Sequence, residues 1–317
     1  MHLRSCFPAL SRFEYVALCG CLCLLICQGC GALGQRSAVH VMGYVAKTGM
    51  PAYLRETDVE LAEPALAASV KLTEALLETA PDDTQLLLQV VQGLAGYTYA
   101  FVEVRIEAAR GRDPEQVRIH TQRAQRLYQR GLQYGLRLLS QYHPPLLQAT
   151  ALSPETLTMH LRRLDRDAVP ALLWTSFCWG GSLNLERTAL ETVTALPLLQ
   201  AMLTRLLELD EGYFYGFPHL LQAVHYASFA TALGGDPVQA QRHFMRAYAL
   251  SQGRLLLVPL LEAQYYAVQV QDRTLFTERL QQVIEAPETL FPEQALLNAV
   301  ARHRAALLLR RIDELFI

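Results

Sequence analysis

Cysteine is the residue type in this chain whose clustering suggests chemistry, either as a metal site or as disulfides. Six of the seven cysteines fall within the first thirty residues, and Cys178 stands alone far downstream. A structural metal site usually takes its ligands as spaced pairs, with a second pair or histidines further along the chain. Here the cysteines are interleaved with Leu, Ile and Gly, and no second pair follows. The spacing therefore predicts no metal site.

The flanks of the cysteine cluster indicate an export signal. Arg4 and Arg12 supply a basic start, and residues 16–26 form an uncharged run of eleven, shorter than the roughly twenty residues that a membrane-spanning helix needs. The next four residues, CQGC, resemble a bacterial lipoprotein signal, in which Cys30 would become the acylated first residue. Cleavage before Cys27 and a plain secretory signal both stay open. We expect a signal peptide at 1–29, a tether at 30–57 and a helical domain at 58–317.

The remainder of the chain carries no recognisable catalytic signature. HExxH, GxSxG, Walker and GxGxxG motifs are absent, and His219 and His225 are six residues apart, which is wrong for one helical face. Cys178 lies between two aromatic residues, so we expect a buried, inert thiol. A formal net charge of −2 gives no reason to expect nucleic acid as a partner, and the basic runs at 162–166 and 302–311 are interpreted as solvated faces. We predict a protein that is not an enzyme and needs no cofactor.

Aromatic residues are concentrated in three strings that are candidates for a binding surface. These are GLAGYTYAFVE (93–103), PALLWTSFCWGGSLNLE (170–186) and DEGYFYGFPHLLQAVHYA (210–227). Aromatic residues at helical spacing usually belong to the core, but a subset lining a groove would suit an apolar or amphipathic ligand. The candidate binding residues are Tyr97, Tyr99, Trp174, Trp179, Asn184, His219, His225, Tyr226, Tyr265 and Tyr266.

Helices must position these candidates, because the sequence after residue 58 shows no sustained strand-like alternation. Asp113 and Ser153 have the character of helix N-caps, and prolines and glycines mark the breaks. The helix that carries both tryptophans is expected to end at Gly180-Gly181. The predicted helices are 59–80, 85–110, 114–141, a short helix from 153, 169–183, 187–209, 212–233, 237–252, 259–270, 273–285 and 292–315.

A repeated spacing within these helices predicts how they stack. A small residue is followed four positions later by a large one, and three positions after that by a small or apolar one. Small residues let two helices approach closely, and the large residue fills the groove between them. The matches are Ala240/Phe244/Ala247, Ala124/Tyr128/Gly131, Ala68/Leu72/Ala75 and, with a large first residue, Phe276/Leu280/Val283.

This spacing predicts an all-α fold of degenerate, tetratricopeptide-like helical hairpins stacked as an α-solenoid. Residues 292–316 form the last predicted helix, which carries several arginines and is expected to serve as a polar cap. Those arginines are Arg302, Arg304, Arg310 and Arg311.

Four strings in this order resemble a known family: YTYAF, LLWTSFCWGGSLN, LLELDEGYFYGFPH and GGDPVQAQRHFMRAYALSQG. Over about residues 60–285 the chain resembles the TatT family, the T components of tetratricopeptide-associated TRAP transporters. The resemblance implies a periplasmic, lipid-anchored protein that assembles as a homotrimer around a central pore. It also implies binding to the periplasmic substrate-binding P component, and passage of a small hydrophobic organic acid toward the permease.

A second interpretation of the same repeats belongs to another functional class. Similar helical repeats recruit machinery for cell-wall or outer-membrane biogenesis, so an envelope assembly scaffold is the alternative function. Binding of a TRAP P component would support the transport function, whereas binding of wall-synthesis proteins without a P component would support the scaffold.

Overall fold

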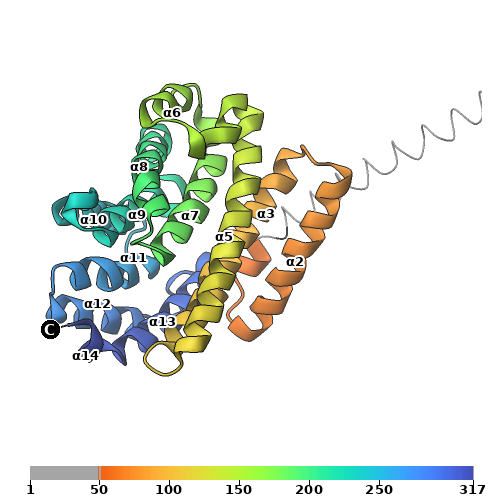
Figure 1. Cartoon of the computed structure of the whole chain (residues 1–317). Helices are drawn as coiled ribbons and strands as arrows, with labels where there is room; N and C mark the ends of the chain where they lie inside the picture. Colours follow the sequence, from red (N-terminus) through yellow and green to blue (C-terminus); the bar gives the residue numbers. More distant parts are fainter. Residues whose placement is uncertain (1–48, 50, 317) are drawn as a thin grey trace, which may run out of the picture. The chain divides into compact units, whose positions relative to one another are not determined.

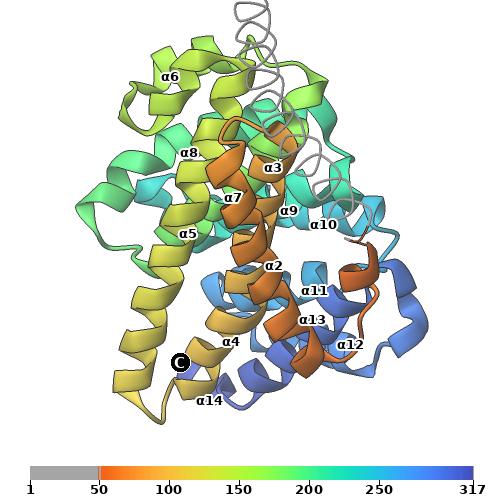
Figure 2. The same ribbon diagram turned by 90° about the vertical axis from the view of Figure 1, so that its right-hand side faces the viewer.

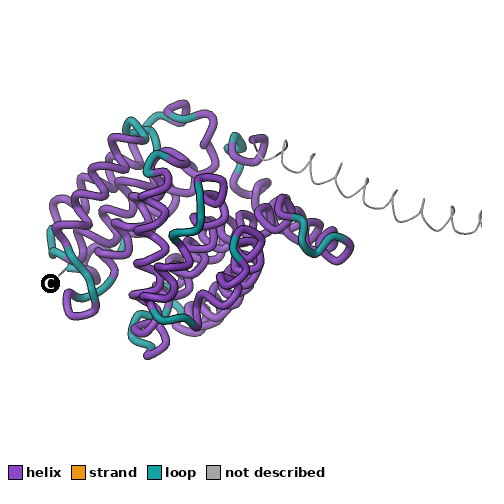
Figure 3. The backbone as a smooth tube through the Cα atoms, turned by 90° about the horizontal axis from the view of Figure 1, so that it is seen from above, coloured by secondary structure: helices purple, strands orange, loops and turns teal. Residues whose placement is uncertain are grey.

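The computed structural model describes residue 49 and residues 51–316. The predicted signal peptide, Cys30 and most of the predicted tether lie outside the described residues. Throughout the described region the chain forms helices and turns without a strand, so the prediction of an all-α fold is confirmed (Figure 3).

The helices follow one another along the chain with short connections. The α-helices are α2 (Val59–Thr79), α3 (Thr84–Tyr97), α4 (Glu103–Ala109), α5 (Pro114–Tyr142), α6 (Pro154–Leu161), α7 (Val169–Leu185), α8 (Leu190–Asp210), α9 (Tyr213–Ser228), α10 (Pro237–Leu250), α11 (Leu257–Leu261), α12 (Arg273–Glu285), α13 (Ala295–Leu309) and α14 (Ile312–Leu315). Two π-helical segments are η1 (Thr98–Val102) and η5 (Glu262–Ala267). Short 3-10 turns are η2 (Pro144–Ala151), η3 (Arg166–Ala168), η4 (Thr231–Leu233), η6 (Glu288–Leu290) and η7 (Pro292–Gln294).

Side-chain caps set where several helices begin. The carboxylates of Asp58, Asp83 and Asp236 each accept two backbone N–H groups from the first turn of the next helix. Asp113 caps α5 and Ser153 caps α6, as the sequence predicted. Each cap satisfies donors that a helix start would otherwise leave unpaired.

Consecutive helices pack against one another as a stacked, solenoid-like array (Figure 1). The succession of neighbours runs from α2 and α3 through α5, α7, α8, α9 and α10 to α11, α12 and α13. The last long helix, α13, packs on α12 and also on α2 and α4, near the start of the array (Figure 2). Residues of α13 therefore join a core with the end of α3 and with η1, where Leu296 and Val300 lie with Tyr97, Ala100 and Phe101.

The stacking signature is confirmed in three helices. In α5, α10 and α12 the marked residues are buried between neighbouring helices, and in α5 and α10 the small ones permit a close approach. The residues are Ala124, Tyr128 and Gly131 in α5, Ala240, Phe244 and Ala247 in α10, and Phe276, Leu280 and Val283 in α12.

The stacking prediction was wrong for α2. Ala68, Leu72 and Ala75 lie on its exposed face, and Leu72 keeps 51% of its surface exposed. The helix instead buries Val70 and Leu77. Helix α2 begins the succession of packed helices, so only part of its surface meets neighbouring helices. The side chains that face α3 therefore determine which face of α2 is buried.

The expectation that Gly180-Gly181 end the tryptophan-bearing helix was also wrong, although the predicted limit of 183 is close to the observed one. Helix α7 continues through Gly180-Gly181 to Leu185. The glycine at 181 serves packing, because a Cβ there would lie 2.7 Å from the Tyr128 ring of α5. The same helix pair meets at Gly131, where a Cβ would lie 2.5 Å from the Cys178 sulfur. Glycine thus permits the close contact of α5 and α7.

The first turn of α9 has an unusual backbone. Phe214, Tyr215 and Gly216 have φ angles of 45°, 62° and 81°, and non-glycine residues with such angles typically cost about 1–3 kcal/mol each. Packing of their rings supports this turn: the Phe214 ring centroid lies 5.7 Å from that of Trp174, and Tyr215 meets Phe291 at 4.8 Å.

Candidate ligand cavity

A cavity of about 240 Å³ lies between the helices, which is space for a small organic molecule. Side chains from α4, α5, α7, α8, α9, η5 and the end of α13 line it. Its apolar wall includes Phe177 from α7, Leu199 and Leu203 from α8, and Phe229 after α9. The cavity thus draws its walls from elements far apart in the sequence.

Four of the ten predicted binding residues in the described region line this cavity. They are Tyr99 in η1, Asn184 in α7, His225 in α9 and Tyr265 in η5. The sequence therefore identified side chains that four separate elements bring to one place. Their role as binding residues stays a prediction.

The other six candidates lie outside the cavity lining. Trp179 is buried in the core with 5% of its surface exposed, and the Tyr97 hydroxyl accepts a hydrogen bond from Arg123 at 2.9 Å. Trp174 belongs to an aromatic cluster with Phe214. His219 contacts His243, the Tyr226 hydroxyl accepts a hydrogen bond from Gln200, and Tyr266 is partly exposed.

Both π-helical segments of the described region contribute to the cavity wall. Segment η1 carries Tyr99, and segment η5 carries Gln264 and Tyr265. Single π-helical turns within α-helices often occur at functional sites, because the wider turn redirects side chains. The local widening of the backbone at η1 and at η5 therefore lies where both segments contribute side chains to the cavity.

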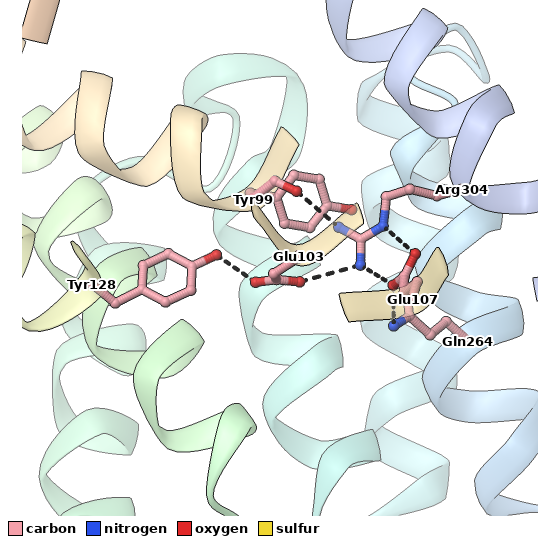
Figure 4. A network of polar contacts seen from close by, with 6 residues as sticks. All are labelled: Tyr99, Glu103, Glu107, Tyr128, Gln264 and Arg304. Atoms are coloured by element: carbon pink, nitrogen blue, oxygen red, sulfur yellow. Dashed lines mark hydrogen bonds and ion pairs between the residues drawn. The ribbon is translucent and has the colours of Figure 1, made fainter. Parts of the chain in front are cut away.

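A buried ion-pair network lies beside the cavity, centred on Arg304 of α13 (Figure 4). Its Nη2 donates to Glu107 Oε1 at 2.5 Å and to Glu103 Oε2 at 3.2 Å, and its Nε donates to Glu107 Oε2 at 3.2 Å. The Tyr128 hydroxyl donates to Glu103 Oε1 at 2.5 Å, and Gln264 donates to Glu107 Oε1 at 3.3 Å. The guanidinium carbon also lies 4.1 Å from the centre of the Tyr99 ring.

The network sets two carboxyl groups against one guanidinium. Glu103 and Glu107 lie one helical turn apart on α4, and both face the single guanidinium of Arg304. Burial raises the pKa of Glu103, although Arg304 and the Tyr128 hydroxyl act in the opposite direction. Burial disfavours the charge on Arg304, but attraction from Glu107, Tyr99 and Glu103 raises its pKa well above the usual value. Arg304 therefore stays charged.

Arg304 corrects one prediction from the sequence. The run 302–311 was interpreted as a solvated face, yet the Arg304 side chain has no exposed surface. Neither glutamate was singled out from the sequence either. One signal was present: Glu103 and Glu107 have helical i, i+4 spacing within an otherwise apolar segment, which indicates a buried partner of opposite charge. The partner itself lies about two hundred residues further along the chain, at separations of 201 and 197.

Five buried polar atoms in the cavity wall have no hydrogen-bond partner. They are Tyr99 Oη, Ser176 Oγ, Asn184 Oδ1, His225 Nδ1 and Gln264 Oε1. Ser176 is 1% exposed and His225 is 7% exposed, so neither reaches bulk solvent. Buried polar groups without partners are rare in folded proteins, and a bound ligand or ordered water commonly supplies the missing bonds. Burial also lowers the pKa of His225 to about 4, so its imidazole is neutral at pH 7.

Three arginines line the outer part of the cavity. Arg110 and Arg187 are exposed, which places them at its mouth, and Arg311 is paired with Glu314 at 2.9 Å. The Arg187 guanidinium lies 5.3 Å from the Tyr265 ring centre. The cavity therefore has an acidic inner part and a basic mouth.

A second titratable cluster joins α9 and α10 away from this lining. His219 Nδ1 lies 2.8 Å from His243 Nδ1, and His219 Nε2 lies 2.9 Å from a Glu211 oxygen that Arg246 also binds. Hydrogen bonds from Arg246 and His219 lower the Glu211 pKa to about 2. All four side chains pair among themselves, so this cluster is best explained as a polar contact that holds α9 against α10.

Several other functional classes find no support in the described part of the chain. Cys178 is buried, and burial raises the pKa of its thiol, as expected for an inert cysteine. Among the described residues no group of three or more His, Cys, Asp or Glu side chains could hold a metal ion. None of the described helices has the length and apolar character needed to cross a membrane.

The fold and the cavity define an all-α, solenoid-like protein, a class that usually binds partners or ligands through the surfaces between its stacked helices. The family model for the TRAP transporter T-component matches residues 55–316, so the chain belongs to that family. No curated protein matches the chain. T components are accessory, envelope-associated parts of TRAP transporters, and this chain shares that role.

Proposed function

We propose that the protein is a periplasmic lipoprotein that docks the substrate-binding P component of a TRAP transporter and holds a small organic acid in its cavity. The observation that carries this proposal is the coincidence of the family match with a lined internal cavity. Five residues of the cavity wall also carry a buried polar atom without a hydrogen-bond partner, which supports a ligand-holding role beyond the joining of two partners. The function is therefore transfer or retention of a ligand, without catalysis.

The stacked helices support partner binding. Solenoid-like arrays offer extended surfaces, and P components are separate proteins that must deliver their ligand to other transporter parts. We propose that acylation at Cys30 holds the protein at a membrane and that three copies form a homotrimer. Acylation with more than one chain gives stable anchoring, whereas one chain alone binds only marginally.

Affinity capture tests the partner. The full chain, purified in detergent, is used to capture proteins from an extract of cells that produce a TRAP P component. Retention of the P component supports the proposal. Retention of wall-synthesis or outer-membrane assembly proteins without a P component would favour the envelope scaffold instead.

Two further measurements test the anchor and the assembly. Labelling with radioactive palmitate should be lost in Cys30→Ser and kept in Cys27→Ser; the reverse result would place the lipid on Cys27. Sedimentation of the full chain in detergent should give the mass of three copies, and a monomer mass would refute the homotrimer.

A further inference from the structure

We propose that the cavity binds a small zwitterion, with an ammonium or similar donor-rich cation at its inner end and a carboxylate at its mouth. This rests on the proposed function, because it names the chemical class of the acid that the cavity would hold. Three observations carry it: the surplus of carboxylates inside, the acceptors without donors, and the arginines at the mouth.

The inner end of the cavity has room for one more positive charge. Glu103 and Glu107 share the single guanidinium of Arg304, so the network has a net charge of −1 when both carboxylates are ionised. An added cation would balance that charge in a region where water is largely excluded and electrostatic attraction is strong.

Most of the unpaired polar atoms in the wall are able to accept a hydrogen bond. Asn184 Oδ1 and Gln264 Oε1 are acceptors only, and the hydroxyls of Tyr99 and Ser176 can accept as well as donate. Neutral His225 can accept at Nδ1 when its proton lies on the other nitrogen. A primary ammonium offers three donors and no acceptor, which matches this wall. A purely apolar tail would leave the acceptors unpaired.

The mouth of the cavity favours an anion. Arg110 and Arg187 are exposed there, and guanidinium groups bind carboxylates through two parallel hydrogen bonds. A simple amine would be repelled by these arginines on its way in. A simple carboxylate would satisfy the mouth and nothing inside, so only a molecule with both charges fits both ends.

Calorimetric titration of the full chain in detergent at pH 7 tests the inference with three probes of equal length: 6-aminohexanoate, hexanoate and hexylamine. We expect 6-aminohexanoate to bind at least about tenfold more tightly than either singly charged probe. Each charged, hydrogen-bonded end typically contributes enough binding free energy for about a tenfold change in affinity. Equal binding of hexanoate would overturn the zwitterion and leave the proposed organic-acid function standing. No binding of any probe would overturn the inference as well.

Two variants assign the ends of the ligand. Arg187→Gln should weaken 6-aminohexanoate binding and leave hexylamine no weaker, whereas Glu103→Gln should weaken 6-aminohexanoate and leave hexanoate unchanged. Arg242→Gln, a change at an exposed arginine of α10 outside the cavity lining, is the matched control and should change neither. If Glu103→Gln fails to fold by circular dichroism, the exposed Arg187 variant decides alone. Unchanged 6-aminohexanoate binding in Arg187→Gln would overturn the assignment. Capture of the P component is measured in a separate experiment, so a failure of the proposed function can be told apart from a failure of the zwitterion inference.

Discussion

Replacing Arg304 with methionine is the sharpest test of the buried network. The substitution keeps an unbranched side chain of similar reach and removes the only cation that faces Glu103 and Glu107 within the network. Breaking a buried pair by deleting one partner typically costs about 3–5 kcal/mol, because the remaining charge stays buried without compensation. We expect the free energy of unfolding at pH 7 to fall by about that amount.

The loss should depend on pH in a defined direction. Burial raises the pKa of Glu103 even with Arg304 present, and the variant removes the group that opposes this rise. A carboxyl whose pKa is higher in the folded than in the unfolded state contributes stability below the unfolded value, near 4.3, and loses it as pH rises through the folded value. The deficit of Arg304→Met should therefore be largest at pH 7 and shrink toward about pH 4.5.

Urea unfolding at both pH values measures this, followed by circular dichroism. Arg242→Met is the control, because Arg242 is exposed on α10, and its effect should stay within about 0.5 kcal/mol. Adding Glu107→Gln to Arg304→Met should restore part of the loss, since it removes one uncompensated carboxylate. A variant whose stability differs from the wild type by less than about 1 kcal/mol at pH 7 would refute the assigned role of the network.

Three further changes have expected outcomes. Gly181→Ala should cost about 1–3 kcal/mol in urea unfolding, because its methyl group meets a ring, whereas a methyl group at Gly96 meets only Leu66, 4.0 Å away at an ordinary contact distance, so Gly96→Ala should be neutral or stabilising; equal effects would contradict the packing argument. N-ethylmaleimide, followed by peptide mass spectrometry, should leave Cys178 unlabelled in the native protein and label it in urea, and fast native labelling would show that the thiol is accessible. Because the pKa of His225 falls from 6.5 to about 4 on folding, the protein should lose about 2 kcal/mol between pH 7 and pH 5 through this group. His225→Gln should lose correspondingly less over that range while the exposed control His303→Gln behaves as wild type, and an unchanged pH slope in His225→Gln would count against a buried neutral imidazole.

Helix positions were largely readable from the sequence. Caps such as Asp113 and Ser153, together with prolines and glycines, mark helix ends through local hydrogen bonding and backbone preference. The helix Arg273–Glu285 has the limits that its sequence indicates. Such features depend on a few neighbouring residues, so no knowledge of the remaining chain is needed.

The candidate site was predictable only in part. Tyr99 and Asn184 drew attention because aromatic and amide side chains in apolar helices need an explanation, and both line the cavity. Trp179 drew attention for the same reason but lies in the core. Helical periodicity shows which residues share a face of one helix, whereas the identity of the neighbour decides whether that face meets a cavity or another side chain.

The sequence by itself determined the all-α class, most helix limits, the small-residue contacts of α5 and α10 and membership of the T-component family, because these depend on local pattern or on the order of strings along the chain. Tertiary structure decided the rest. It turned α2 so that Leu72 faces outward, carried α7 past Gly181, and brought Arg304 to Glu103 and Glu107 across about two hundred residues. A buried charge is stable only where a distant partner arrives, and that arrival depends on how α13 packs against the first helices.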